Sequence, residues 1–198
     1  MTFASHERTG KGAVDAASSA ALRVRVLVTL VAFMTLVAGG EHTLVAADVV
    51  VSEIHYHPLA SEGEIEFIEL ENTTSRAIDL SGWAFTEGIA YEFPEGTVIE
   101  PHGLIVLCRD PDTLARSFGL DPSALHWWFG ASLDNGGERL VLVDLEGRIV
   151  EEVEYDDDAP WDRDADGFGP SLERVCLEAP ADLPNNWVAD IERRPTPL

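Results

Sequence analysis

Short runs of apolar residues, each ended by turn-forming residues, recur along most of the chain. The run at residues 49–56 is rich in β-branched and aromatic side chains and stops before Pro58, because proline cannot donate to a strand ladder. At residues 64–71, apolar side chains alternate with glutamates, which is the pattern of a strand with one buried and one polar face. Both runs predict strands.

Further runs follow at regular intervals, with glycine or proline between them. They cover residues 77–80, 83–86, 90–93, 97–99, 103–107 and 171–177. The clearest hairpin joins residues 138–145 to residues 148–155 across a glycine-containing turn. Regular short strands are typical of a sandwich or barrel, so we expect an all-β fold. No long linker interrupts the series, and we expect one domain over residues 48–190 with a tail at residues 191–198.

One short helix and one further helical turn are expected among the strands. Asp110 is a favourable N-cap, proline suits the first helical position, and the helix should end before Gly119. Asp121 and Pro122 repeat this start signal for a single turn. The next segment, residues 126–129, reads His-Trp-Trp-Phe, and we expect it to plug one end of the core because it is too aromatic to remain in water.

The N-terminal part has the layout of a secretory signal. Four basic residues precede an apolar run at residues 26–38, and the small residues Val45, Ala46 and Ala47 follow. The run is shorter than the roughly 20 residues that a membrane-spanning helix needs. We therefore expect a cleaved signal peptide at residues 1–47 and a protein that is secreted, periplasmic or on the cell surface. An uncleaved leader would instead anchor it to a membrane.

The excess of acidic over basic residues limits the classes of partner that the protein is expected to bind. The chain has 36 acidic and 13 basic residues, a net charge of −23. Loss of the leader removes three acids and four bases, so the mature charge is −24, and Lys11, the only lysine, is lost with it. Such a surface repels polyanions and attracts cations or basic partners, so direct nucleic-acid binding is not expected.

The sharpest local motif has the spacing of a calcium loop. Residues 162–167 read Asp-Arg-Asp-Ala-Asp-Gly, and a glutamate follows at the closing position. The candidate calcium ligands are Asp162, Asp164, Asp166 and Glu173. Proline before and inside the loop excludes the flanking helices of an EF-hand. Glu173 points away from the aspartates if residues 171–177 form a strand, so a calcium site and a solvated acidic loop are both open interpretations.

Histidines and cysteines offer two further interpretations. His55 and His57 would share one face of an extended strand and reach a zinc ion together with His102 or His126, although an edge or capping role explains them equally well. Cys108 and Cys176 both lie in the exported part, where a disulfide is permitted, but two separate buried thiols are the alternative.

Several stretches, taken in order, resemble the lamin tail domain family in its bacterial exported form. They are residues 52–58 (Ser-Glu-Ile-His-Tyr-His-Pro), 66–72 (Glu-Phe-Ile-Glu-Leu-Glu-Asn), 79–83 (Asp-Leu-Ser-Gly-Trp), 167–174 with its Ser-Leu-Glu-Arg end, and 185–187 (Asn-Asn-Trp). The resemblance implies an immunoglobulin-like β-sandwich. Its recurring residues have structural explanations: Phe67, Ile68, Leu80 and Trp83 in the core, Gly82 in a close turn and Asn72 bonded to its own backbone in a turn.

The resemblance also implies a function class. Bacterial members look like adhesion or interaction modules, commonly appended to exported hydrolases, and carry no known catalytic residues. We expect this chain to be the module alone: an exported, non-enzymatic binding or structural protein with an unidentified protein or surface partner. The alternatives are a metal-dependent hydrolase that uses the histidines or the aspartate loop, and a calcium-binding accessory protein. Nucleophile-elbow and phosphate-loop motifs are absent from the sequence.

Overall fold

The protein is an immunoglobulin-like β-sandwich in a computed structural model that describes residues 47–61, 65–189, 195 and 197. The chain divides into two units, residues 1–41 and 42–198, and the described residues belong to the second. The predicted leader except its last residue, Ala47, and most of the tail lie outside the described residues, so both stay predictions. No helix in the described part is long and apolar enough to cross a bilayer.

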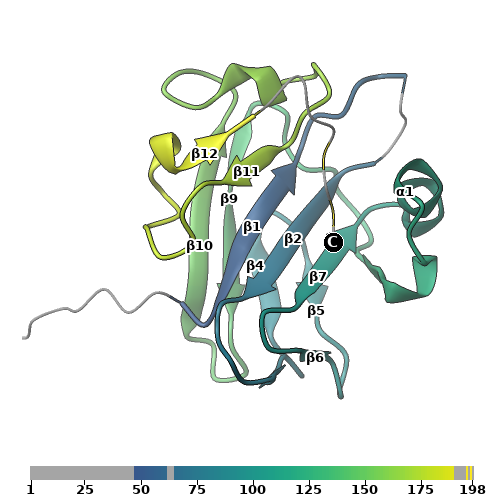
Figure 1. The fold of residues 1–198 in the computed structure, drawn as a ribbon, viewed down its shortest axis with the longest axis vertical. Coiled ribbons are helices and arrows are strands. Elements are labelled where there is room, and N and C mark those ends of the chain that lie inside the picture. The colour runs from purple at the N-terminus through teal and green to yellow at the C-terminus, as the bar shows by residue number, and fades with distance from the viewer. Residues whose placement is uncertain (1–46, 62–64, 190–194, 196, 198) are drawn as a thin grey trace, which may run out of the picture. The chain divides into compact units, whose positions relative to one another are not determined.

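Two sheets face each other across the core (Figure 1). The large sheet has the strand order β12-β11-β1-β2-β7-β8, and the small sheet has the order β10-β9-β4-β5. The large sheet contains β1 (Val49–His55), β2 (Phe67–Asn72), β7 (Leu104–Cys108), β8 (His126–Trp127), β11 (Leu172–Arg174) and β12 (Trp187–Val188). The small sheet contains β4 (Ala84–Glu87), β5 (Tyr91–Glu92), β9 (Gly137–Val143) and β10 (Ile149–Asp156). All pairings are antiparallel except that of β7 with β8.

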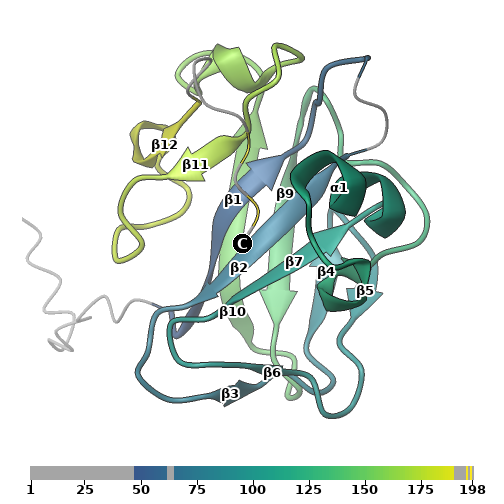
Figure 2. The same ribbon diagram turned by 45° about the vertical axis from the view of Figure 1, so that its right-hand side comes forward.

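A small ribbon of β3 (Ile78–Asp79) and β6 (Val98–Ile99) lies at one end of the sandwich, at the bottom of Figure 2. Short 3-10 helices fill three of the connections: η1 (Pro122–Ala124), η2 (Arg163–Ala165) and η3 (Pro184–Asn186). The first of these is the helical turn that the sequence predicted after Asp121.

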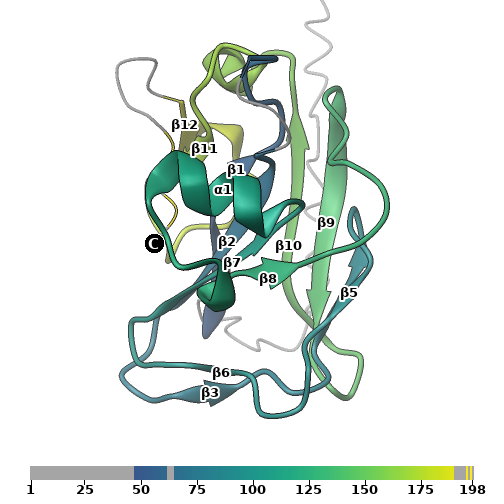
Figure 3. The ribbon, with the colours of Figure 1, turned by 90° about the vertical axis from the view of Figure 1, so that its right-hand side faces the viewer.

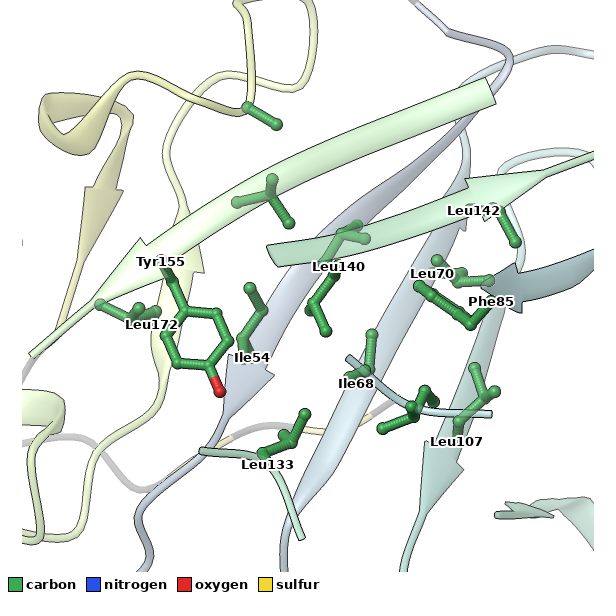
Figure 4. Close-up of a cluster of buried hydrophobic side chains, with 14 of the residues drawn as sticks. Ile54, Ile68, Leu70, Phe85, Leu107, Leu133, Leu140, Leu142, Tyr155 and Leu172 are labelled. Carbon is green, nitrogen blue, oxygen red and sulfur yellow. The ribbon is translucent and has the colours of Figure 1, made fainter. Parts of the chain in front are cut away.

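The alternation of residues along β1 and β2 determines which side chains reach the core. Ile54 of β1 lies opposite Ile68 of β2, and both are fully buried between the sheets. A bulge after Val51 shifts the register, so that Glu53 lies opposite Glu69. Figure 4 shows the resulting core, in which side chains of β1, β2, β7 and β11 meet those of β4, β9 and β10.

The predicted helix is present and covers the outer face of the large sheet. It is α1 (Pro111–Phe118), capped by the Asp110 side chain, which accepts a hydrogen bond from the backbone N–H of Thr113, and ended by Gly119 at φ 75°. Its buried residues pack with Phe67 of β2 in a second apolar cluster. Figure 3 shows α1 on the side of the large sheet that faces away from β9 and β10. Phe67 is therefore buried as predicted, but outside the main core.

Each strand predicted from an apolar run is present, but some details differ. The last of these, expected over residues 171–177, extends only over Leu172–Arg174, because the chain turns away after pairing with β1 and β12. The two-residue strands β8 and β12 were not predicted. Of the other expected core residues, Ile68 and Leu80 are fully buried, whereas Trp83 is only partly buried against the core.

Candidate interaction site

The loop that follows the edge strand β8 is hydrogen-bonded to the sandwich at both ends. Trp128 is only 1% exposed, and its backbone N–H donates to the carbonyl of Cys108 at 3.1 Å while its indole N–H donates to the carbonyl of Ala131 at 3.1 Å. Leu133, at the other end, is also buried and donates its N–H to the Glu66 carboxylate at 3.0 Å. The loop is therefore fixed to the sandwich at both ends.

The two aromatic residues beside Trp128 are exposed. Trp127 is 55% exposed and Phe129 is 81% exposed. Their rings contact edge to face, with centroids 5.8 Å apart and planes at 79°. The expectation that residues 126–129 plug the core is thus correct only for Trp128, whose side chain is buried while those on either side of it are exposed. We call Trp127 and Phe129 the aromatic ridge.

A shallow hollow of about 240 Å³ adjoins the aromatic ridge. It is lined by Arg109, the ridge itself, Trp128 and Gly130. Arg109 hydrogen-bonds the Ser132 hydroxyl, and its guanidinium lies 3.8 Å from the Glu66 carboxylate. Glu66 is thereby shared between Arg109 and the Leu133 N–H. The positive charge of Arg109 is therefore balanced by the nearby carboxylate of Glu66.

The aspartates of the candidate calcium loop make hydrogen bonds within the protein. Asp162 caps η2, accepting from the Asp164 N–H at 3.2 Å with one oxygen and from the Ala189 N–H at 3.0 Å with the other. Asp166 accepts from the ring Nδ1 of His57 at 2.6 Å, and Asp164 is exposed. Within the described ranges, no group of three or more histidine, cysteine or acidic side chains is arranged to hold a metal ion.

Glu173, the predicted closing ligand, lies within β11 opposite Glu53 of β1 and Val188 of β12. Glu173 is therefore part of the large sheet, whereas the aspartates belong to the η2 turn. The pairing of β11 with β1 and β12 therefore decides the position of Glu173, whereas the local spacing alone suggested a place beside the aspartates.

The four histidines do not converge either. His55 is buried beside Phe67, with Nδ1 3.2 Å from the Ile65 carbonyl. Burial lowers its pKa to about 4, so its ring is neutral at physiological pH. His126 lies in β8, three strands from β1, and its Nδ1 is 2.8 Å from the Tyr91 hydroxyl. Three strand spacings are about 14 Å.

The remaining two histidines have separate surroundings. His57 bonds Asp166, and His102 lies in the turn between β6 and β7 with φ 53°. The zinc interpretation therefore gains no support in the described residues, because these histidines lie on different strands and turns of the sandwich.

The predicted disulfide is not formed, and both cysteines are free thiols. Cys108 ends β7, whereas Cys176 follows β11, and β1 and β2 lie between these two strands. Three strand spacings of about 4.8 Å far exceed the separation of about 7 Å that a disulfide tolerates. Cys108 is buried, which raises the pKa of its thiol to about 12, and Cys176 is exposed.

Sequence reasoning missed the aromatic ridge for a specific reason. Four consecutive aromatic residues were read as one apolar block, although alternation in extended backbone was the signal that separates buried Trp128 from its neighbours. Composition gives no information on which of two alternating faces meets the core.

A family model described as Lamin Tail Domain matches residues 43–157 of the chain. None of the curated proteins matches this sequence. The matched range includes the aromatic ridge and ends after β10. Strands β11 and β12, which pair in series beyond β1, lie outside the matched range.

Proposed function

The chain belongs to the lamin tail domain family, and from this premise we propose that it is an exported module that binds a partner protein outside the cytoplasm. The family is one of immunoglobulin-like structural domains rather than enzymes. The observation that carries the binding role is the aromatic ridge, because it exposes two large aromatic side chains on a loop that is fixed at both ends. Aromatic residues on a rigid base are typical of binding hot spots.

Export is supported by the N-terminal pattern of basic residues, apolar run and small residues. The strongly acidic composition is compatible with a soluble domain in the exterior, since excess carboxylates keep molecules apart. The mature protein would begin at Asp48.

The alternative of a metal-dependent hydrolase has less support than the binding module among the described residues. A catalytic metal needs three protein ligands and an open coordination position, and the candidate histidines lie on separate elements. The His57 and Asp166 pair remains close, but no further metal-ligating side chain of the described part joins it in a metal-holding group.

The test uses the full chain, tagged at its C-terminus and expressed in its native host. We expect the protein in the exterior fraction with Asp48 as its first residue, as read by N-terminal sequencing. Chemical cross-linking there should enrich one partner reproducibly, and untagged protein should compete for it. Retention in the cytoplasm would contradict export. Zinc-dependent hydrolytic activity that is lost in His57→Ala would show that the protein is an enzyme and would contradict the proposal of a non-enzymatic binding module.

A further inference from the structure

The aromatic ridge has the physical properties of a preorganised docking site. Single exposed apolar residues are common on protein surfaces, but here two aromatic rings contact each other beside a hollow. The buried Trp128 and Leu133 hold the loop on either side of Phe129. Binding at such a site costs little conformational entropy, because the backbone that presents the rings is already ordered.

The size of the hollow indicates what it accepts. Pockets for whole small molecules typically measure about 300–1,000 Å³. The hollow beside the ridge is about 240 Å³ and shallow, which suits one side chain of a larger partner.

The charge distribution selects the kind of side chain. Arg109 is bonded to Ser132 and lies beside Glu66, so the hollow offers an anion no uncompensated positive charge. Two acidic residues, Asp110 and Asp112, follow the lining residue Arg109 in the chain. The net charge, −23 for the full chain and −24 without the predicted leader, also attracts cations over a longer range. A tryptophan face binds an arginine or lysine cation favourably.

We propose that Trp127 and Phe129 dock a segment of a partner protein in which arginine or lysine residues stand next to apolar ones. This proposal rests on the proposed function, because it names the partner class of the binding module. The cation stacks on an exposed ring of the ridge, and the neighbouring apolar side chain enters the hollow.

The experiment measures the affinity of the exported protein, purified as its host processes it, for a fluorescently labelled peptide of alternating arginine and leucine. Trp127→Ala and Phe129→Ala should each weaken binding tenfold or more, as expected for hot-spot aromatic residues. Leu145→Ala is the matched control, because Leu145 is 69% exposed on the turn between β9 and β10, and its affinity should stay within about twofold of the unmodified protein. The unfolding midpoint of all variants should be unchanged because the replaced side chains are exposed.

Two further peptides separate the contributions. A peptide of alternating arginine and serine has the same charge without the apolar residues. It should bind more weakly than the arginine and leucine peptide, and Trp127→Ala should weaken it further, because the cation stacking on the ring remains. A glutamate and leucine peptide should not bind. Raising the salt concentration should weaken the arginine and leucine peptide, because exposed charges are screened.

Several results would overturn the proposal: no binding of the arginine and leucine peptide at millimolar concentration, equal affinities of Trp127→Ala and Leu145→Ala, or ridge-dependent binding of a neutral oligosaccharide such as cellohexaose in place of the peptide. If the ridge variants keep their cross-linked partner in the native host, the module function stands and the ridge is not its site. If no partner is captured at all, the proposed function itself fails.

Discussion

Arg174 of β11 donates a hydrogen bond to Glu151 of β10 at 2.7 Å, and this ion pair joins the large sheet to the small sheet in the interior. The two side chains are only 3% and 7% exposed. Arg174 also donates to the carbonyls of Val51 and Ala179 and lies over the ring of Trp187. A buried arginine cannot lose its proton, so its surroundings must supply the compensating charge and acceptors.

Removing one partner of this pair should be costly. We expect Arg174→Leu or Glu151→Leu to lower the free energy of unfolding by about 3–5 kcal/mol, because each leaves a buried polar group without its partner. The double variant should lose less than the sum of the two, by about 2 kcal/mol or more. Urea denaturation of the four proteins measures this coupling, and strictly additive losses would show that the pair is not coupled.

Glu151 should also make stability depend on pH. Burial raises its pKa from 4.5 to about 7, although Arg174 acts in the opposite direction. The folded protein therefore binds this proton more tightly than the unfolded chain does. The resulting stability is fully present below pH 4.5 and is lost as the pH rises through about 7.

Glu151→Gln isolates this effect, because the amide mimics the protonated carboxyl and does not titrate. Relative to this variant, the unmodified protein should lose up to about 3 kcal/mol between pH 4.5 and pH 8, since one pKa unit corresponds to about 1.4 kcal/mol. Unfolding curves across this pH range test the sign. A difference that grows in favour of the unmodified protein with rising pH would contradict it.

The η2 turn gives a test inside the predicted calcium motif. Asp162→Ala should lower the free energy of unfolding by about 1–2 kcal/mol, because Asp162 accepts hydrogen bonds from the N–H groups of Asp164 and Ala189. Asp164→Ala should stay within about 0.5 kcal/mol, because Asp164 is exposed. Thermal unfolding with and without millimolar calcium provides the check. If calcium stabilises the unmodified protein and this stabilisation is lost equally in both variants, the aspartates bind calcium and the interpretation as a metal loop is correct.

The same motif shows where sequence reasoning ends. The alternation in β2 and the cap, proline and glycine around α1 are local signals, and both elements formed as predicted. The ligand spacing is equally local, but the fold delivers His57 to Asp166 across a separation of 109 residues. Which distant segment reaches a carboxylate depends on strand order, and spacing carries no information about that order.

The sequence analysis missed strands β8 and β12 for a related reason. β8 and β12 have two residues each, and unlike the equally short β3, β5 and β6 they were not recognised as strands from the sequence. Their existence depends on partners, since β8 pairs with β7 after the α1 connection and β12 pairs with β11. The disulfide prediction failed because the cysteines follow strands whose separation in the sheet is a topological property.

Thiol reactivity tests that correction directly. In the folded protein, Cys176 should react with iodoacetamide without any reductant, because it is exposed. Cys108 should react only after unfolding, since it is buried and the pKa of its thiol is raised to about 12. Mass spectrometry counts the modified thiols. If neither cysteine reacts in denaturant until a reductant is added, a disulfide is present after all.

Asn72, at the end of β2, does more than the local turn role that the sequence predicted. Its Oδ1 accepts from the backbone and hydroxyl of Thr74, which is the expected turn. Its Nδ2 donates to the carbonyls of Arg76, Ile99 and Glu100 at 2.7, 3.2 and 2.9 Å, so the buried amide also ties β2 to the connection between β6 and β7.

Asn72→Asp replaces this donor with a second acceptor facing three carbonyl oxygens. We expect it to lower the free energy of unfolding by more than about 3 kcal/mol at pH 7, because a buried charge loses its partners and meets like partial charges. The loss should shrink in acid, where a protonated carboxyl donates again. Asn135→Asp makes the same chemical change at an exposed position and should cost less than about 0.5 kcal/mol. Equal losses in urea denaturation of the two variants would mean that the donor bonds of Asn72 contribute nothing to the stability of the sandwich.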